Sequence, residues 1–346
     1  MIDQVSIDEF LVLQSGLVVA DVRTPDEYLH GHIPGAVNLP LFSNEERVLV
    51  GTTYKQAGRE QAVLLGFEIT GPKWAGFIRD ALALAPSRKI ALHCWRGGMR
   101  SGAMAWALDF FGFDVYLLQG GYKAYRKWAH HQFARQYHIH LLGGKSGSGK
   151  TILLRQLRAK GEAVIDLEDL AQHQGSTYGT LNRMVQPSQE QFENNLAVTL
   201  SAISEGERLW VEDESISIGK RFIPRAFWNQ MCAADLYDIR ITDGQRVQNL
   251  LREYGPLDKD YLADCTQRIW KRLGHERTAN AITAIREDRM ADFIQHLLVY
   301  YDKTYTTSVS MRPASSVVPV PLLSTDLESD ITALLASVRQ LQTKQE

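Results

Sequence analysis

Residues 138–151 read HIHLLGGKSGSGKT, an apolar run followed by a glycine-rich loop. The loop satisfies the pattern G-x4-G-K-[ST] from Gly144 to Thr151, in the strand-to-helix context that the pattern requires. Backbone N–H groups of such a loop cradle a di- or triphosphate, Lys150 neutralises its charge and Thr151 can bind Mg²⁺. The stretch predicts a P-loop α/β domain with these phosphate-binding residues: Gly144, Gly147, Gly149, Lys150 and Thr151. It leaves open whether ATP, GTP or another diphosphate is bound.

The chain after this loop is predicted to continue as an α/β domain with a helical C-terminal part. Short apolar runs indicate strands at 163–166, 209–211 and 236–242, and longer periodic segments indicate helices within 245–303 and over 326–342. One predicted strand ends in WVEDE, where Glu212 and Asp213 are candidates to hold a metal ion beside the phosphates. An ordinary acidic loop is the alternative interpretation.

A second candidate functional loop, called the cysteine loop, lies in the N-terminal third, where residues 93–101 read HCWRGGMRS. It follows a predicted strand at 89–93 and precedes a predicted helix at 101–111, so backbone N–H groups and the helix N-terminus would surround Cys94. Such donors lower a thiol pKa and stabilise an anion on sulfur. We therefore take Cys94 as the nucleophile, assisted by Arg100 and by Arg96. A buried structural cysteine is the alternative, and the two glycines and two arginines argue against it.

The first 130 residues alternate between predicted strands and helices, which indicates a parallel sheet. Further strands are expected at 17–21 and 115–118, and helices at 44–70 and 124–137. The last of these helices is expected to lead from one unit into the next. We predict two domains, at 1–134 and 135–346.

Composition fits two globular domains and excludes several classes. The chain has 346 residues, with 38 Lys and Arg against 40 Asp and Glu, so it is not a strongly basic polyanion-coating protein. Three cysteines without a C-x-x-C pair exclude a disulfide scaffold and a zinc ribbon. Without a signal peptide or an apolar run of membrane-spanning length, we expect a cytoplasmic protein and no membrane partner.

Two local basic clusters qualify the near-neutral charge. Their central residues are Lys123, Arg126 and Lys127 in the first, and Arg268, Lys271 and Arg272 in the second. Clusters of this kind bind nucleic-acid phosphates, or are solvated helix faces.

Residues 21–38, DVRTPDEYLHGHIPGAVN, together with LQGGY at 118–122, resemble the rhodanese signature. The resemblance covers about residues 5–130 and implies a cysteine that carries a persulfide or a related chalcogen. Common sulfurtransferases of this fold place the arginine five positions after the cysteine, whereas Arg100 is six after Cys94. That spacing also matches cysteine-dependent phosphatases, so the loop alone leaves phosphatase and chalcogen transferase open.

The occurrence of both domains in one chain indicates a smaller set of protein families than either domain does alone. With the cysteine loop, the stretches DLEDLAQHQGS at 166–176 and VEDES at 211–215 make the whole chain resemble the bacterial tRNA 2-selenouridine synthase family. The resemblance implies that selenium from selenophosphate replaces the sulfur of wobble 2-thiouridine in tRNA, through an S-geranyl intermediate made from geranyl diphosphate. It further implies a perselenide on Cys94, the prenyl diphosphate in the P-loop, tRNA on the basic clusters, and a selenophosphate-producing enzyme as a partner. The rival hypothesis is a cysteine-dependent phosphatase or sulfurtransferase fused to a nucleotide-binding, kinase-like domain.

Overall fold

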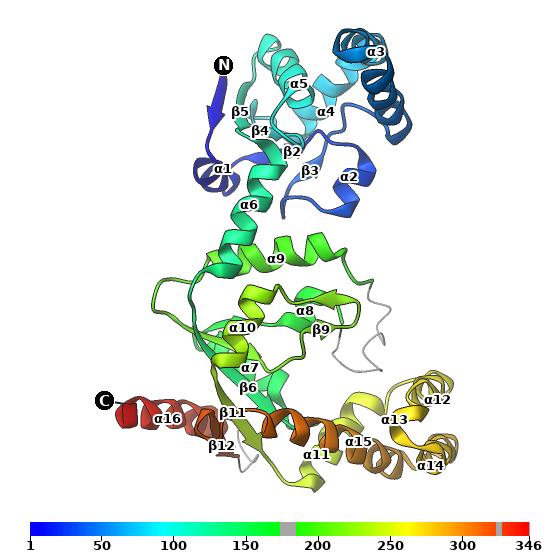
Figure 1. The fold of residues 1–346 in the computed structure, drawn as a ribbon, viewed down its shortest axis with the longest axis vertical. Coiled ribbons are helices and arrows are strands. Elements are labelled where there is room, and N and C mark those ends of the chain that lie inside the picture. The colour runs from blue at the N-terminus through cyan, green and yellow to red at the C-terminus, as the bar shows by residue number, and fades with distance from the viewer. Residues whose placement is uncertain (174–184, 323–326, 346) are drawn as a thin grey trace. The chain divides into compact units, whose positions relative to one another are not determined.

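The computed structural model describes residues 1–173, 185–322 and 327–345 (Figure 1). Gln174, Gly175 and Ser176, at the end of one quoted stretch, lie outside the described residues. Contacts divide the chain into two units, Met1–Phe133 with Glu190–Val198, and Ala134–Gln189 with Thr199–Glu346. The domain boundary between residues 134 and 135 stays a prediction. Among the described residues, no helix has the length and apolarity needed to cross a membrane.

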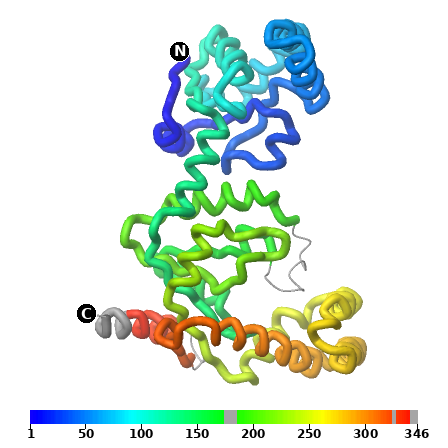
Figure 2. The backbone as a smooth tube through the Cα atoms, in the orientation of Figure 1, coloured from blue at the N-terminus to red at the C-terminus, as the bar shows by residue number. Residues whose placement is uncertain are grey.

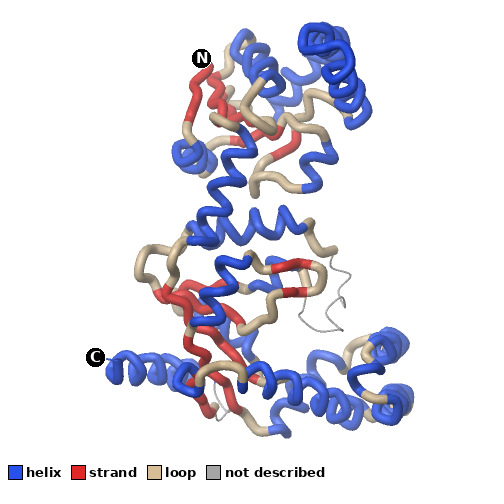
Figure 3. The backbone as a smooth tube through the Cα atoms, viewed as in Figure 1, coloured by secondary structure: helices blue, strands red, loops and turns tan. Residues whose placement is uncertain are grey.

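The first unit is built on a sheet of five parallel strands in the order β1-β5-β4-β2-β3. The strands are β1 (Ile2–Val5), β2 (Val18–Asp21), β3 (Val37–Asn38), β4 (Lys89–His93) and β5 (Asp114–Leu118). Helices enclose the sheet, as the secondary-structure colours of Figure 3 show. They are α1 (Ile7–Gln14), α2 (Pro25–His30), α3 (Asn44–Thr70), α4 (Trp74–Leu84), α5 (Met99–Phe110) and α6 (Gly121–Ala134), with a 3₁₀ turn at Gly71–Lys73. The parallel α/β class predicted for this unit is confirmed.

Helix α3 has the predicted bounds but is not continuous. Gly58 has φ 89° and ψ 177°, which breaks the helical path between two arms. Glycine adopts this backbone conformation without the steric penalty that a Cβ atom brings. The course of α3, in blue, can be followed in Figure 2.

Helix α6 begins and ends three residues earlier than predicted, at Gly121 and Ala134. Its end has a specific cause in the side chain of Gln230. The Gln230 Nε2 donates to the carbonyl of Arg135 at 2.8 Å, and its Oε1 accepts from the N–H of Tyr137 at 3.1 Å. These bonds replace helical ones, so the chain leaves the helix and enters the next strand extended.

The second unit is built on another sheet of five parallel strands, in the order β12-β11-β6-β8-β7. These are β6 (His138–Gly144), β7 (Ala163–Ile165), β8 (Arg208–Glu212), β11 (Asp235–Arg240) and β12 (Val317–Pro321). A small antiparallel pair, β9 (Ser217–Ile218) and β10 (Arg221–Phe222), lies apart from the sheet order. The P-loop leaves the central strand β6, at the edge where parallel sheets carry their ligands.

Helices follow the strands along this part of the chain and then dominate its C-terminal part. They are α7 (Lys150–Ala159), α8 (Leu167–Ala171), α9 (Gln189–Ser201), α10 (Arg225–Ala233), α11 (Asp243–Tyr254), α12 (Lys259–Arg268), α13 (Trp270–Leu273), α14 (His275–Arg286), α15 (Met290–Ser310) and α16 (Leu327–Gln345), with a 3₁₀ turn at Ala314–Ser316. The helices from α11 to α15 bury their own apolar cluster around Leu262, Ile285 and Phe293. The predicted P-loop class with a helical C-terminal part is confirmed.

Most of α9 is grouped with the first unit, although it follows the P-loop in sequence. The Asn194 side chain, fully buried, donates to the Tyr122 hydroxyl at 2.7 Å and to the carbonyl of His32 at 2.9 Å. The Tyr122 hydroxyl in turn donates to Glu190 at 2.9 Å. This chain of hydrogen bonds fixes the helix against the segment that follows the cysteine loop.

Candidate functional site

Cys94 lies directly after β4, at the start of the loop that leads into α5. Its side chain is buried, with 3% exposed, and Sγ accepts a hydrogen bond from the Ser101 hydroxyl at 3.1 Å. Burial raises the pKa of the thiol, but the Ser101 hydroxyl and the backbone N–H groups of Ser101, Arg96 and Gly98 outweigh it. The pKa of Cys94 therefore lies below its ordinary value, as a nucleophile or a carrier of an anion requires.

Two glycines let the loop pack tightly against the segment at the start of α6. Gly97 has φ +63°, and a Cβ atom there would lie 2.7 Å from the carbonyl oxygen of Leu118. Gly121 has φ +58°, and its Cβ would overlap the carbonyl of Cys94. Because both lack side chains, the N–H of Tyr122 reaches the Cys94 carbonyl at 2.8 Å. The LQGGY segment is thus the support that shapes the cysteine loop.

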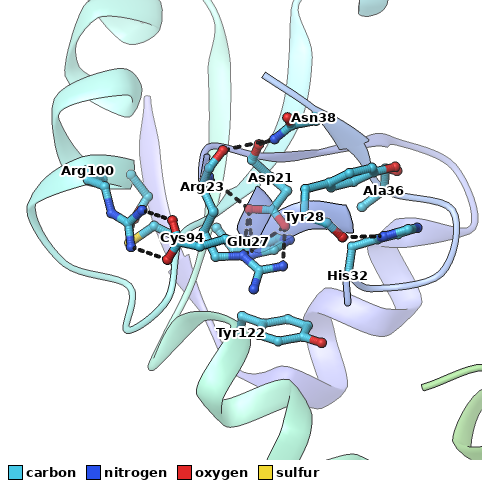
Figure 4. Close-up of polar contacts among 12 residues, drawn as sticks. Asp21, Arg23, Glu27, Tyr28, His32, Ala36, Asn38, Cys94, Arg100 and Tyr122 are labelled. Atoms are coloured by element: carbon cyan, nitrogen blue, oxygen red, sulfur yellow. Dashed lines mark hydrogen bonds and ion pairs between the residues drawn. The ribbon is translucent and has the colours of Figure 1, made fainter. Parts of the chain in front are cut away.

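Arg100 is held beside the site by a carboxylate that the sequence analysis did not single out. Its Nη1 donates to Glu27 Oε2 at 2.5 Å and its Nη2 to Glu27 Oε1 at 3.1 Å (Figure 4). Burial raises the pKa of Glu27, but Arg100 and the N–H of Thr24 lower it by more than burial raises it. The pKa of Glu27 therefore lies below its ordinary value, and the pair is ionic. Arg96 is exposed, and both arginines line the same groove as Cys94.

Other residues of the rhodanese-like signature form a polar network that supports the cysteine loop. Asp21 and Arg23 form a buried ion pair at 2.6 Å, and the Arg23 guanidinium lies 3.8 Å from the ring centre of Tyr122. The Asn38 side chain donates to the backbone carbonyls of both residues at 2.9 Å. Figure 4 shows this network around Arg23, with the hydroxyl of Tyr28 bonded to Ala36. These residues position the loop and are not placed to react.

His93, next to the nucleophile, is buried and neutral. Burial lowers its pKa to about 4, against a raising effect of Asp21. Neither ring nitrogen has a hydrogen-bond partner among the described residues. An uncharged imidazole that is fully enclosed among other side chains supports the loop by packing and is not placed to act as a general acid toward substrate.

The three glycines of the predicted phosphate-binding loop all have a positive φ. Gly144, Gly147 and Gly149 have φ values of +148°, +80° and +86°. A Cβ atom on Gly147 would lie 2.7 Å from the carbonyl of Arg246, so a larger residue cannot occupy that position. The Lys150 ammonium donates to the carbonyl of Gly144 at 2.9 Å and lies 3.7 Å from Glu212. Thr151 follows on the first turn of α7.

Three carboxylates gather beside Lys150, from Glu168 on α8 and from Glu212 and Glu214 at the end of β8. Oxygen atoms of the three lie within 4.8 Å of one another. Burial and then the charges of the other two raise the pKa of Glu168 to about 9, and burial and Glu212 raise that of Glu214 to about 8. The buried Oε2 of Glu212 has no partner among the described residues. A divalent cation would relieve this repulsion, and oxygen ligands beside a phosphate-binding loop fit Mg²⁺.

Asp213, the other predicted acidic partner, points elsewhere. Its Oδ1 accepts from Arg312 at 3.0 Å, and it is not a member of the carboxylate group. Neither Glu168 nor Glu214 had a predicted role, although both stand in the stretches that carry the family resemblance. The signal for Glu168 was its place just after the strand β7, next to the central strands of a parallel sheet.

The predicted basic residues differ in their surroundings. Arg126 is engaged in its own unit, with an ion pair to Glu193 and a hydrogen bond to Asn194 at 2.5 Å. The other cluster residues are exposed, namely Lys123, Lys127, Arg268, Lys271 and Arg272. Arg272 also reaches the Tyr300 hydroxyl at 3.3 Å.

A thiol with a lowered pKa and, elsewhere in the chain, a P-loop flanked by carboxylates are the features of an enzyme with two chemically distinct sites. Residues 7–127 match the rhodanese-like domain family, and residues 137–319 match the family described as the tRNA 2-selenouridine synthase AAA domain.

Curated relatives extend this likeness over most of the chain. A tRNA 2-selenouridine synthase of Shewanella sediminis is 36% identical over 334 residues, which cover 85% of this chain and 88% of that protein. One of Shewanella denitrificans is 35% identical over 310 residues, covering 85% and 81%. One of a Sulfurovum species is 34% identical over 338 residues, covering 86% and 90%. The chain therefore belongs to the tRNA 2-selenouridine synthase family.

Proposed function

We propose that the chain replaces the sulfur of wobble 2-thiouridine in tRNA by selenium, through an S-geranylated intermediate. Selenophosphate is the selenium donor and geranyl diphosphate the prenyl donor. The anion-stabilising surroundings of the Cys94 sulfur carry this proposal, because a perselenide on that sulfur has its negative charge on the terminal selenium and needs hydrogen-bond donors as the thiolate does. The cytoplasm is the proposed location, with a selenophosphate-producing enzyme as a partner.

The P-loop is the proposed site of prenyl transfer. Lys150 and the loop N–H groups would bind the diphosphate and stabilise the charge that develops on it as the geranyl group leaves. Glu168, Glu212 and Glu214 would hold Mg²⁺, which shields the leaving diphosphate when it is bound. Alkylation of the C2 sulfur then turns a thiocarbonyl into a group that can depart as a thiolate.

The net selenium step is redox-neutral. Selenium bonds to C2, geranylthiolate departs with the electron pair of the C2–S bond, and the phosphoryl group leaves selenium for water as phosphate. A perselenide on Cys94 holds selenium two electrons more oxidised than selenophosphate does. Loading this carrier therefore takes a low-molecular-weight disulfide, which is reduced to two thiols. Cleavage of the Cys94 S–Se bond after attack on C2 takes two thiols, which return the two electrons, leave as a disulfide and regenerate the Cys94 thiol.

tRNA is the proposed macromolecular substrate, with its anticodon loop splayed to present the wobble base. Lys123 and Lys127 on α6, and the exposed cluster at Arg268, Lys271 and Arg272, are the proposed phosphate contacts. Arg126 contributes less in this proposal because Glu193 already neutralises it.

The experiment that tests the proposal follows the two half-reactions separately. A thiolated tRNA is incubated with each donor alone and analysed by mass, and the Cys94 peptide is analysed for selenium after incubation with selenophosphate and a disulfide. We expect Cys94→Ala to geranylate the tRNA and to incorporate no selenium. Release of phosphate from simple phosphoesters, without any selenium on Cys94 or tRNA, would favour a phosphatase instead.

A further inference from the structure

We propose that the groove between α3 and α5, which opens onto Cys94, binds the prenylated wobble nucleoside, with the geranyl chain on its apolar floor and the RNA backbone on its basic rim. This inference rests on the proposed function, whose S-geranyl intermediate supplies the apolar chain. It places the binding site for the prenyl group of that intermediate in the first unit. The prenyl donor would react elsewhere, at the P-loop.

Six large apolar side chains of the groove lining, here called the floor, are exposed. They are Val48, Leu64 and Phe67 from α3, Met99 and Trp106 from α5, and Trp95 from the cysteine loop. Each of these side chains is at least 38% exposed. A set of large apolar side chains around one hollow is the mark of a ligand or partner surface, since isolated exposed side chains do not converge in this way.

The break at Gly58 explains how one helix supplies so much of this surface. Val48 lies on the arm before Gly58, whereas Leu64 and Phe67 lie on the arm after it, and all three line the same groove. A straight helix of this length presents residues so far apart in sequence at widely separated points along its axis. The bend turns both arms toward the cysteine loop.

The charged side chains of the groove lining, here called the rim, are mostly cationic, and most of them form no ion pair among the described residues. Arg47, Lys55 and Arg59 line the groove from α3 and have no ion-pair partner within the described part of the chain, while Glu60 is the acidic residue in the lining. With Arg96, which has no ion-pair partner among the described residues either, the groove faces its ligand with an excess of cations, whereas Glu27 already neutralises Arg100. An apolar floor inside a cationic rim suits an apolar group attached to a polyanion, which describes a prenylated nucleoside within RNA.

The size of the groove supports the same ligand. Its volume is about 1560 Å³, whereas pockets for single small molecules range from about 300 to 1,000 Å³. The groove therefore has room for a nucleoside together with a ten-carbon chain. Because Cys94 lines it too, C2 of a nucleoside seated there would face the sulfur that is proposed to carry selenium.

The experiment compares two variants of the full-length protein that differ in one respect. Leu64 and Leu49 both lie on α3 and are both 52% exposed, but only Leu64 lines the groove. Binding of anticodon stem-loop RNAs with an S-geranyl or an S-methyl 2-thiouridine at the wobble position is measured by fluorescence anisotropy. We expect the wild type to bind the geranyl RNA about 100-fold more tightly, because each buried methylene contributes a factor of roughly four and full burial of about three to four of the additional carbons suffices for that preference. Leu64→Glu should reduce this preference to a few-fold, and Leu49→Glu should keep it.

The outcomes separate the groove from the reaction. Equal affinity of the wild type for both RNAs, or an unchanged preference in Leu64→Glu, would overturn the groove assignment. Failure to convert the geranyl RNA to selenouridine, with the preference intact, would overturn the proposed function and leave the groove as the prenyl-binding site. If Leu64→Glu does not fold, as judged by its melting temperature, Leu64→Ala serves in its place. Arg59→Gln should weaken both RNAs equally, and unchanged affinities would remove the RNA backbone from the rim.

Discussion

Replacing Ser101 by alanine tests whether the loop activates Cys94. The substitution removes the hydroxyl that donates to Sγ at 3.1 Å and leaves the backbone N–H groups of Arg96, Gly98 and Ser101 in place. A hydrogen bond to a charged group contributes about 1.5–3 kcal/mol, so the thiolate-to-thiol ratio should fall by about 10- to 100-fold. Because the hydroxyl favours the anion, its loss raises the pKa of Cys94.

The assay is alkylation of the full-length protein by iodoacetamide at several pH values, with the Cys94 peptide quantified by mass. Below the thiol pKa the rate follows the thiolate fraction, so the rate at Cys94 should fall in Ser101→Ala by the same factor. Exposed Cys232 in the same sample is the internal reference and should not change. Ser101→Thr keeps the hydroxyl and should retain most of the rate. An equal rate for wild type and Ser101→Ala would refute the argument, provided that both melt at the same temperature.

Three further predictions address the other charged groups. Lys150→Ala should lose geranylation first and still load selenium on Cys94, and a variant with unchanged affinity for geranyl diphosphate would count against the P-loop assignment. The pKa of Glu168 is raised to about 9, so the folded protein retains a proton that the unfolded chain releases near its ordinary value. The protonated Glu168 side chain contributes its full stabilisation below the ordinary glutamate pKa and loses it as pH rises toward 9. Melting temperatures measured without metal should therefore decline over this pH range. Glu168→Gln or added Mg²⁺ should reduce the decline. Glu27→Gln removes the negative charge that holds Arg100, and selenium incorporation should slow by about tenfold, with geranylation as the unaffected control.

The central parts of both sheets were predictable because they are continuous apolar runs that end in loops. Two of the edge strands, β1 and β12, were not. The run IDQV of β1 carries two polar side chains, and VVPVP of β12 contains two prolines, which normally argue against a strand. Strand β12 tolerates Pro319 because it pairs only with β11, so its missing N–H is needed by no second neighbour.

The candidate sites likewise divide into parts that the sequence predicts and parts that it does not. Cys94 and the P-loop lie in contiguous motifs, and each motif carries its own chemistry. The carboxylate group could not be derived because Glu168 lies 44 residues before Glu212, and only the pairing of β7 with β8 brings them together. The Glu27–Arg100 pair depends likewise on the pairing of β2 with β4, which brings the helices α2 and α5 that follow them to one end of the sheet.

Helix α9 means that the chain cannot be divided by one cut. The helix is encoded downstream of the P-loop, yet its buried Asn194 satisfies Tyr122 and His32 of the first unit. A fragment that stops at residue 134 would lose these partners and would leave the buried rings of Tyr122 and Tyr125 open to water. The rhodanese-like unit is therefore completed late in translation, only after the P-loop has been synthesised. Transplanting it into another protein would require the helix to be supplied as a second piece.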